Sequence, residues 1–166
     1  MANMKPGDWL ENDRCSIARS LEIVGERWAL LILREVFLGI RRFDQMQQHL
    51  GIARNILADR LRTLVDHGIL EQRLYQERPS RYEYRLTEKG IDLYPALMML
   101  MAWGDKHLSG RRGPALALEH KTCGHATTLV VACGECGERV TARDIRPLPG
   151  PGAPRKAHKA SATRVA

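Results

Sequence analysis

The chain has 166 residues and a formal net charge of +7, and 44% of its residues are apolar. This apolar fraction can fill a hydrophobic core, so the composition excludes a wholly disordered or a collagen-like chain. The longest apolar run, Ala96 to Trp103, is far shorter than the ~18 residues of a membrane-spanning helix, so we expect no membrane partner. Residues 1–14 lack the apolar stretch of a signal peptide. We therefore expect a cytoplasmic protein with reduced cysteines.

The positive charge is concentrated towards the C-terminal end of the chain. Residues 147–166 contain four basic residues, no acidic residue and half of the eight prolines. We interpret this segment as a disordered basic tail, and residues 1–14 as an N-terminal arm. Such a tail either adds a weak, salt-sensitive attraction to a polyanion or only keeps the protein soluble.

Two helices are predicted within residues 15–38, because apolar residues recur at helical spacing on both sides of Gly25. Gly39 suits the left-handed backbone that ends a helix. Asp44 is then expected to cap a brief helix that runs to His49.

A longer helix is predicted from Arg54 to Asp66. Its residues Leu57, Leu61 and Leu64 recur at i, i+4 and i+7, so they should face the core and leave the other side of the helix free. A short helix, a turn with glycine and a longer helix have the spacing of a helix-turn-helix.

Two strand candidates follow this helix pair. They run from Ile69 to Tyr75 and from Arg81 to Leu86, and Pro79 lies in the turn between them, where it blocks strand pairing. A helix-turn-helix followed by a hairpin is a winged helix-turn-helix. The predicted fold class is therefore mainly α (α+β), with a winged-helix domain for DNA binding and dimerisation over residues 15–110.

The last predicted helix has a broad apolar surface. Thr87 is expected to cap it, and Pro95 should either kink it or mark a join. Leu100 and Trp103 extend its apolar surface beyond one stripe. Such a surface usually packs against another, so we predict a homodimer formed through the Ile91–His107 helix and the N-terminal helix. The alternative is that this helix packs only on its own domain.

The chain lacks the common signatures of enzymes. It contains no Gly-x-Ser-x-Gly, no Walker loop, no Gly-x-Gly-x-x-Gly and no His-Glu-x-x-His sequence. Its six histidines are scattered, and none forms an evident pair with a nucleophile. We predict that the protein is not an enzyme.

The charge of the predicted helix-turn-helix and hairpin favours double-stranded DNA as the partner. Between Arg41 and Arg85 there are nine arginines and no lysine, and guanidinium groups grip phosphates and guanine edges in a forked geometry. The start of the longer helix is the end that usually meets base edges. Some arginines should instead pair with acidic neighbours, so we expect about half to contact DNA. The candidate DNA-binding residues are Arg41, Arg42, Arg54, Asn55, Arg60, Thr63, Arg78 and Arg81.

Two other classes of partner compete with duplex DNA. RNA binding is disfavoured because the chain has only nine aromatic residues, and unpaired bases need aromatic platforms. A metal- or thiol-dependent protein-interaction module without DNA binding remains the alternative, although the arginine-only charge of the motif argues against it.

A small Cys/His appendage is predicted over residues 115–146. Two strands, Ala115 to Thr122 and Thr127 to Ala132, are expected in it. Its size is about a third of what an independent hydrophobic core needs, so another force should hold it together.

Two turns of the appendage repeat one pattern, ligand-x-x-ligand-Gly. In such turns backbone amides surround a thiolate, and two of them can close a tetrahedral, structural zinc site. A reversible disulfide between Cys133 and Cys136 and unligated thiols are the alternatives. The candidate metal ligands are His120, Cys123, Cys133 and Cys136, with His125 as a substitute for His120.

Several short segments together resemble one family of regulators. They are Cys15–Ala18, Val24–Trp28, Leu31–Glu35, Arg41–Phe43, Ile52–Leu57, Arg60–Leu61, Gly68–Leu70, Tyr82–Thr87 and Gly90. This combination, spread from about Cys15 to Trp103, resembles HxlR-type winged-helix regulators of the MarR-like superfamily. One departure concerns the start of the recognition helix, where many members have Ser and this chain has Ala53.

The resemblance implies a dimeric bacterial transcription factor that binds an inverted-repeat operator, most often as a repressor. Several members respond to electrophiles or oxidants through a cysteine near the N-terminus, and Cys15 matches that position. As a sensor, Cys15 needs an accessible thiolate, which a helix start beside Arg14 would favour. The alternative is a small apolar residue wedged between helices. A small-molecule effector could also bind between the dimer helix and the helix-turn-helix.

Overall fold

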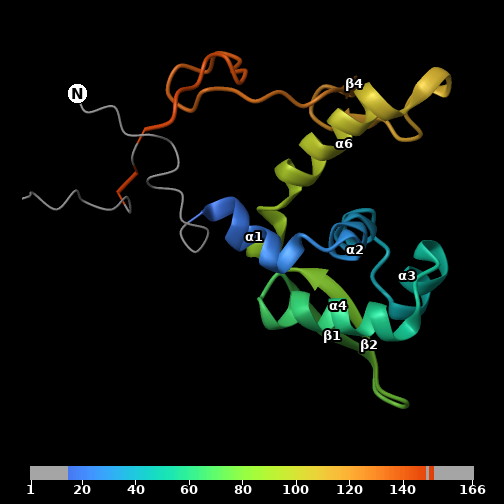
Figure 1. The fold of residues 1–166 in the computed structure, drawn as a ribbon. Coiled ribbons are helices and arrows are strands. Elements are labelled where there is room, and N and C mark those ends of the chain that lie inside the picture. The colour runs from blue at the N-terminus through green and yellow to red at the C-terminus, as the bar shows by residue number, and fades with distance from the viewer. Residues whose placement is uncertain (1–14, 149, 152–166) are drawn as a thin grey trace, which may run out of the picture.

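The computed structural model describes residues 15–148 and 150–151. The predicted N-terminal arm and most of the predicted basic tail lie outside the described residues. The chain forms a winged-helix body (residues 15–93), a long helix that leads away from it, and the appendage (residues 115–146) at the far end of that helix (Figure 1). Among the described residues, no helix has the length and apolar character needed to span a bilayer.

The body begins with two helices, α1 (Ser16–Val24) and α2 (Arg27–Phe37), as predicted. The break between them requires glycine, because a Cβ atom at Gly25 would lie 2.4 Å from the carbonyl oxygen of Leu21. The second helix ends at Phe37, and Gly39, which follows its C-cap residue Leu38, has a left-handed φ of +88°.

The helix-turn-helix consists of α3 (Phe43–Leu50) and α4 (Arg54–Asp66), joined through Gly51 in the left-handed region. The bounds of α4 are those predicted. The prediction that Asp44 caps α3 is wrong, because Arg42 occupies the cap position without a side-chain cap. Arg42 forms a backbone bridge with Glu83, so the extended chain ends there and the helix begins at the next residue. Asp44 lies in the first turn, where a negative charge favours the helix dipole.

The core of the body lies between α2 and α4. Leu57, Leu61 and Leu64 are at most 1% exposed, as their spacing predicted, and they belong to one apolar cluster with Ile32 and Leu33 of α2. Burial of side chains of this size is the main stabilising term of such a small domain.

The wing is an antiparallel hairpin of β1 (Leu70–Gln76) and β2 (Arg81–Leu86), which agrees with the prediction to within one residue. Its base joins the core through Leu70 and Tyr84. Its tip extends away from the helices into solvent (Figure 1).

The hairpin leads into α5 (Glu88–Ile91) and then α6 (Tyr94–Leu108). Thr87 caps α5 as predicted, since its side chain accepts a hydrogen bond from the N–H of Gly90 at 3.1 Å. Pro95 lies in the first turn of α6, where its missing N–H costs nothing, so it marks a join and not a kink. A short 3₁₀ turn, η2 (Gly110–Arg112), follows α6.

The appendage contains one short hairpin, β3 (Leu118–His120) and β4 (His125–Thr127). The predicted strands, 115–122 and 127–132, are therefore too long, and the second is misplaced. The tight turn after His120 reverses the chain, so β4 begins at His125 opposite His120 and ends at Thr127 opposite Leu118. Beyond Met98, none of the described residues is buried.

Candidate nucleic-acid interface

The face of α4 that points away from the core is exposed. The side chain of Arg54 at its start is 73% exposed, and Asn55, Asp59 and Arg62 are also exposed. Arg62 was missing from the predicted set. At 100° per residue it lies on the side opposite the buried leucines, so the spacing of the helix could have identified it.

The start of α4 presents free backbone donors as well as side chains. Ala53 occupies the cap position and provides no side-chain hydrogen bond, as its departure from serine indicated. The first intrahelical donor is Leu57, whose N–H bonds to the Ala53 carbonyl at 3.0 Å. The preceding N–H groups of the helix are therefore available to a phosphate oxygen.

Three of the predicted DNA-binding arginines share one groove. Arg42, Arg54 and Arg81 line a groove of about 510 Å³ between the starts of α3 and α4 and the wing. The guanidinium of Arg42 lies 4.4 Å from the ring centre of Tyr75, and that of Arg54 lies 4.9 Å from that of Phe43. Contacts of this kind orient a guanidinium without neutralising its charge.

Two further predicted arginines, Arg41 and Arg78, are solvent-exposed. Arg41 precedes α3, and Arg78 lies in the turn of the wing. The tip is ordered by its own hydrogen bonds, from Gln76 Nε2 to the carbonyl of Arg78 at 3.0 Å and from Ser80 Oγ to the carbonyl of Glu77 at 3.1 Å. These bonds order the backbone of the turn that carries Arg78.

Arg60 and Thr63 are the predicted residues of α4 that lie outside this groove and are only partly exposed. The Arg60 side chain is 29% exposed, and its Nη2 lies 3.4 Å from Asp59 Oδ2. Thr63 donates its hydroxyl to the carbonyl of Asp59 at 3.1 Å. Arg60 is three residues from Leu57 and four from Leu64, which places it beside the buried stripe.

Acidic neighbours pair with three of the nine arginines between Arg41 and Arg85, and the sequence had indicated that some of them would be paired. Arg54 lies 4.0 Å from Asp44, and Arg85 lies 2.6 Å from Glu83. Arg60 is the third. Within the described residues, the six other arginines of this region have no carboxylate within 4.0 Å, and they are Arg41, Arg42, Arg62, Arg73, Arg78 and Arg81.

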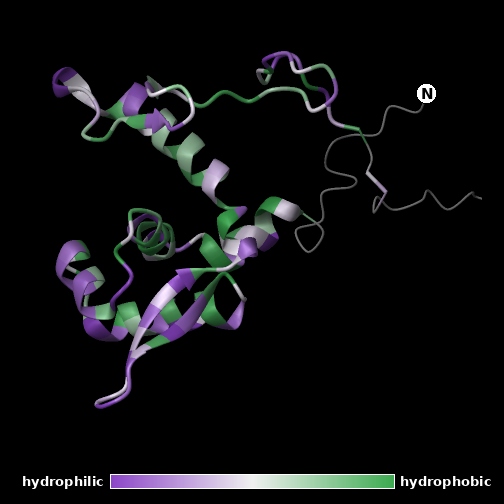
Figure 2. Ribbon diagram, turned by 180° about the vertical axis from the view of Figure 1, so that it is seen from behind, coloured by the Kyte–Doolittle hydropathy of each residue, from purple (hydrophilic) through white to green (hydrophobic). Residues whose placement is uncertain are grey.

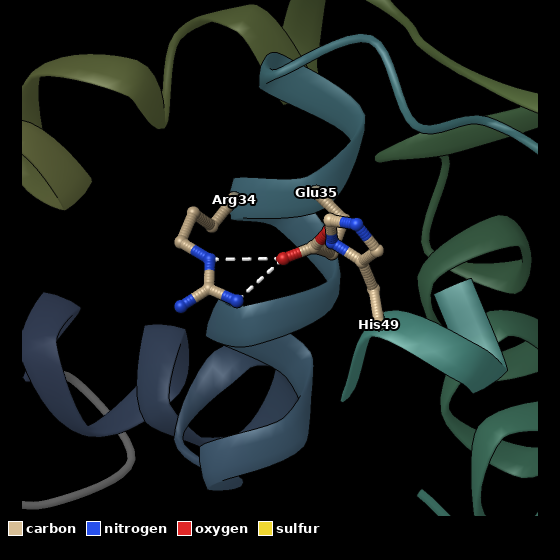
Figure 3. Close-up of polar contacts among 3 residues, drawn as sticks. All are labelled: Arg34, Glu35 and His49. Atoms are coloured by element: carbon tan, nitrogen blue, oxygen red, sulfur yellow. Dashed lines mark hydrogen bonds and ion pairs between the residues drawn. The ribbon is translucent and has the colours of Figure 1, made fainter. Parts of the chain in front are cut away.

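A buried carboxylate connects the helix-turn-helix to α2. Glu35 is only 1% exposed, and its carboxylate accepts a hydrogen bond from Arg34 Nε at 3.0 Å and lies 3.1 Å from His49 Nδ1 (Figure 3). His49 belongs to the last turn of α3, so this contact fixes α3 against α2. Sequence reasoning missed Glu35, because a glutamate on an amphipathic helix is usually solvated.

A second surface is apolar and lies on α1 and α6. A groove of about 370 Å³ runs between α1, α2 and α6, and Leu21, Leu97 and Leu100 line it. Figure 2 shows apolar residues along α6 where it leaves the body. The large apolar side chains exposed on the two helices are Ile17, Leu21, Met99, Leu100, Trp103 and Leu108.

The HxlR-like helix-turn-helix family model matches residues 23–112. The chain belongs to this family. An HTH-type transcriptional regulator of Mycobacterium tuberculosis, Rv3095, is 51% identical to it over 137 residues, which cover 82% of this chain and 87% of the relative. The regulator YdeP of Bacillus subtilis is 31% identical over 111 residues, 64% of this chain and 87% of the relative.

Solved structures give the same assignment for the HxlR-like chain. The crystal structure of the transcription factor PA1607 has a TM-score of 0.73 and 37% identity, and the match covers 82% of this chain and 96% of that one. The solved structure of PA1374 from Pseudomonas aeruginosa has a TM-score of 0.59 and 40% identity, and the match covers 84% of this chain and 95% of that one. The protein is thus a transcriptional regulator with a winged helix-turn-helix fold. Its relatives are regulators and not enzymes, and they do not support an interaction module that lacks DNA binding.

The N-terminal cysteine of this HxlR-like protein lies at the start of α1. Cys15 occupies the cap position and is half-buried. The next residue, Ser16, lines the apolar groove between α1, α2 and α6. The predicted sensor position is therefore adjacent to the apolar surface.

The five candidate metal ligands fall into two separate turns. Nδ1 of His120 lies 3.3 Å from Sγ of Cys123, and His125 follows on β4. Cys133 and Cys136 form the second turn, where backbone hydrogen bonds from Cys136 and then Glu135, and one from the Cys136 side chain, lower the pKa of the Cys133 thiol. In the described part of the chain, no three His, Cys, Asp or Glu side chains are close enough to hold a metal ion.

Proposed function

We propose that this HxlR-like regulator binds an inverted-repeat operator as a homodimer, with α4 of each protomer in a major groove, and that it represses transcription in the cytoplasm. The observation that carries this proposal is the exposed start of α4, where Arg54 lies in one groove with Arg42 and Arg81. No segment of the described chain covers this surface.

Direct readout of bases would come from the first turn of α4. Arg54 and Asn55 are exposed at the helix end that enters the major groove first in helix-turn-helix proteins. Arginine binds guanine and asparagine binds adenine with paired hydrogen bonds. Arg42 and Arg81 flank this turn and suit phosphate contacts, which position the protein without reading sequence.

The apolar surface on α1 and α6 supports the homodimer. A second copy of the same surface would cover Leu21, Leu100 and Trp103, which are all more than half exposed in the single chain. Two-fold symmetry of the protein would then match an inverted repeat, with half-sites about one helical turn apart. Family resemblance supports repression, since most HxlR-type regulators are repressors.

Cys15 is the proposed point of control. Addition of its thiol to the activated C=C bond of an electrophile forms a thioether, with the thiol proton transferred to the other carbon of that bond, and it adds bulk beside the α1–α6 surface. Two solved structures similar to this chain are titled as the redox regulator HypR in its reduced and oxidised forms, with 25% and 26% identity and a TM-score of 0.52 each. A small apolar ligand in the groove between α1, α2 and α6 would act at the same place.

Selection from a pool of random duplex DNA tests the proposal. The full-length protein should enrich an inverted repeat, and its affinity for random duplex should fall steeply with salt because counterions are released. Enrichment of unrelated sequences with no two-fold symmetry would contradict the homodimer on an operator. Absence of any salt-sensitive duplex binding would contradict DNA recognition itself.

Three alanine variants test which surface of the protein binds DNA. Arg54→Ala should relax the preference for bases in the selected site, whereas Arg81→Ala should weaken all duplexes alike and reduce the salt slope by about one. Arg143→Ala removes the same charge from the exposed appendage and serves as the control. If Arg143→Ala weakens binding as much as Arg54→Ala does, the face of α4 is not the recognition surface.

Two further variants test assembly and control. Leu100→Asp should convert the dimer to a monomer in sedimentation experiments, because it places a charge in the apolar surface.

Cys15→Ser should bind the operator normally but keep it bound after treatment with an electrophile such as N-ethylmaleimide. A Cys15→Ser protein released as readily as the natural one would exclude Cys15 as the sensor. Placing the selected operator across a reporter promoter measures the sign of regulation, and repression is expected.

A further inference from the structure

The two cysteine turns of the appendage have the same backbone. The carbonyl oxygen of His120 accepts a hydrogen bond from the N–H of Gly124 at 2.8 Å, and that of Cys133 accepts one from Gly137 at 2.9 Å. Both glycines are left-handed, with φ of +69° at Gly124 and +74° at Gly137. The repeated sequence pattern is therefore a repeated structure.

Each turn also closes a short antiparallel pairing between its first and sixth residues. His120 at the end of β3 pairs with His125 at the start of β4. The N–H of Cys133 bonds to the carbonyl oxygen of Glu138 at 2.8 Å. The equivalence thus extends over six residues, and it places one donor side chain at the first position and one at the fourth position of both turns.

The first donor pair has almost the spacing that zinc imposes. Nδ1 of His120 lies 3.3 Å from Sγ of Cys123. A Zn–N bond of about 2.0 Å and a Zn–S bond of about 2.3 Å at a tetrahedral angle give a separation of about 3.5 Å. His125 follows the turn instead of opening it, so it is not equivalent to Cys133.

We propose that His120, Cys123, Cys133 and Cys136 bind one zinc ion, which draws the two turns together. Nine residues separate Cys123 from Cys133. Residues 128–131 within this segment are neither helix nor strand, and the segment carries the second turn away from β4 (Figure 1). A chain of this length spans up to ~33 Å, so it can fold back and bring the four donors to one point. With four protein ligands the ion has a structural and not a catalytic role.

The appendage needs such a centre because it has no hydrophobic core. Val130, Val131 and Ile145 are 57%, 50% and 63% exposed. Binding of zinc to thiolates and imidazole contributes folding free energy directly, which is how domains of this size become stable. Leu118 at the start of β3 lines a groove with Met98 of α6, so a folded appendage would be anchored on that helix.

The experiment measures metal in the full-length protein purified under reducing conditions. Elemental analysis should find about one zinc per chain. Replacement by Co²⁺ should give the ligand-field absorption of a tetrahedral site and a thiolate-to-cobalt charge-transfer band. Chelation should expose residues 115–146 to protease while the circular dichroism of the body stays unchanged. None of these readouts depends on DNA binding, so they test the zinc site separately from the proposed function.

Matched variants assign the ligands. Cys123→Ser, Cys133→Ser and Cys136→Ser should each weaken metal affinity by at least about tenfold, as should His120→Asn. His125→Asn is the control within the same turn, and it should retain the metal. Metal loss from His125→Asn but not from His120→Asn would overturn the proposed ligand set. Zinc-free protein with freely reactive thiols, or with a Cys133–Cys136 disulfide seen as the loss of two hydrogens in its mass, would overturn the site.

Discussion

The winged-helix body and the appendage are held together by different means. In the body, the three leucines of α4 are at most 1% exposed and pack against α2. In the appendage none of the described residues is buried, although the segment contains several large apolar side chains. The body therefore has its own hydrophobic core, whereas the appendage has two hydrogen-bonded turns rich in metal donors. Apolar content alone therefore does not make a core, because the apolar residues must also recur at the spacing of one face.

Removal of a core leucine should have the largest effect. Leu61→Ala is expected to lower the free energy of unfolding of the body by about 2–5 kcal/mol, because it leaves a cavity in the apolar cluster. Urea denaturation followed by circular dichroism measures this change. Ile56→Ala, on the exposed side of the same helix, is the control and should cost less than about 1 kcal/mol. Equal losses for the two variants would mean that the core lies elsewhere.

A methyl group at Gly90 should have the next largest effect. A Cβ atom there would lie 2.2 Å from the carbonyl oxygen of Ile69, which is main chain and cannot move aside as a side chain can. Gly90→Ala is expected to cost about 1–3 kcal/mol in thermal or urea unfolding. Gly104→Ala, in α6, adds the same methyl where no atom lies within 4 Å, and it should be neutral or stabilising. A neutral Gly90→Ala would show that α5 does not pack on the body as described.

Loss of the buried charge should have a moderate effect. Glu35→Gln removes the negative partner of Arg34 and His49, and we expect a loss of about 1–2 kcal/mol because both partners remain solvated at the surface. Glu22→Gln, exposed on α1, is the control. Since Glu35 fixes α3 against α2, operator affinity should fall together with stability. If Glu35→Gln lowers the free energy of unfolding no more than the control Glu22→Gln does, the contact contributes nothing to stability.

A change in the appendage should have the smallest effect on the body. Val131→Ser replaces a half-exposed side chain that touches no core, so the free energy of unfolding of the body should change by less than about 0.5 kcal/mol. A loss comparable to that of Leu61→Ala would mean that the appendage and the body share one core.

The sequence predicted the body well because several local signals agree there. Gly51, the leucine spacing and Gly68 together fix α4 from Arg54 to Asp66, which is the helix observed. Pro95 has only two structural meanings in such a pattern, and the structure selects the join. Family resemblance and hydrophobic periodicity pointed to the same elements.

The appendage and the polar details of the site were predicted less well. The two strands of the appendage were predicted wrongly, because short strands around a tight turn leave no periodic pattern of apolar residues. The Asp44 cap failed because pairing of Arg42 with the wing, a tertiary contact, decides where α3 begins. The buried Glu35 contacts His49, fourteen residues away, and no local sequence pattern reveals that contact. Arg62, by contrast, could have been found from its angle on the helix.

Photo-crosslinking from α4 shows whether this helix lies in a groove of the DNA. A photoreactive amino acid in place of Asn55 should crosslink to bases of the selected duplex, whereas the same group in place of Val131 should not. This result would place the exposed start of α4 in a groove of DNA. Crosslinks from position 131 with none from position 55 would contradict the claim, since the appendage and not the helix-turn-helix would then contact the operator.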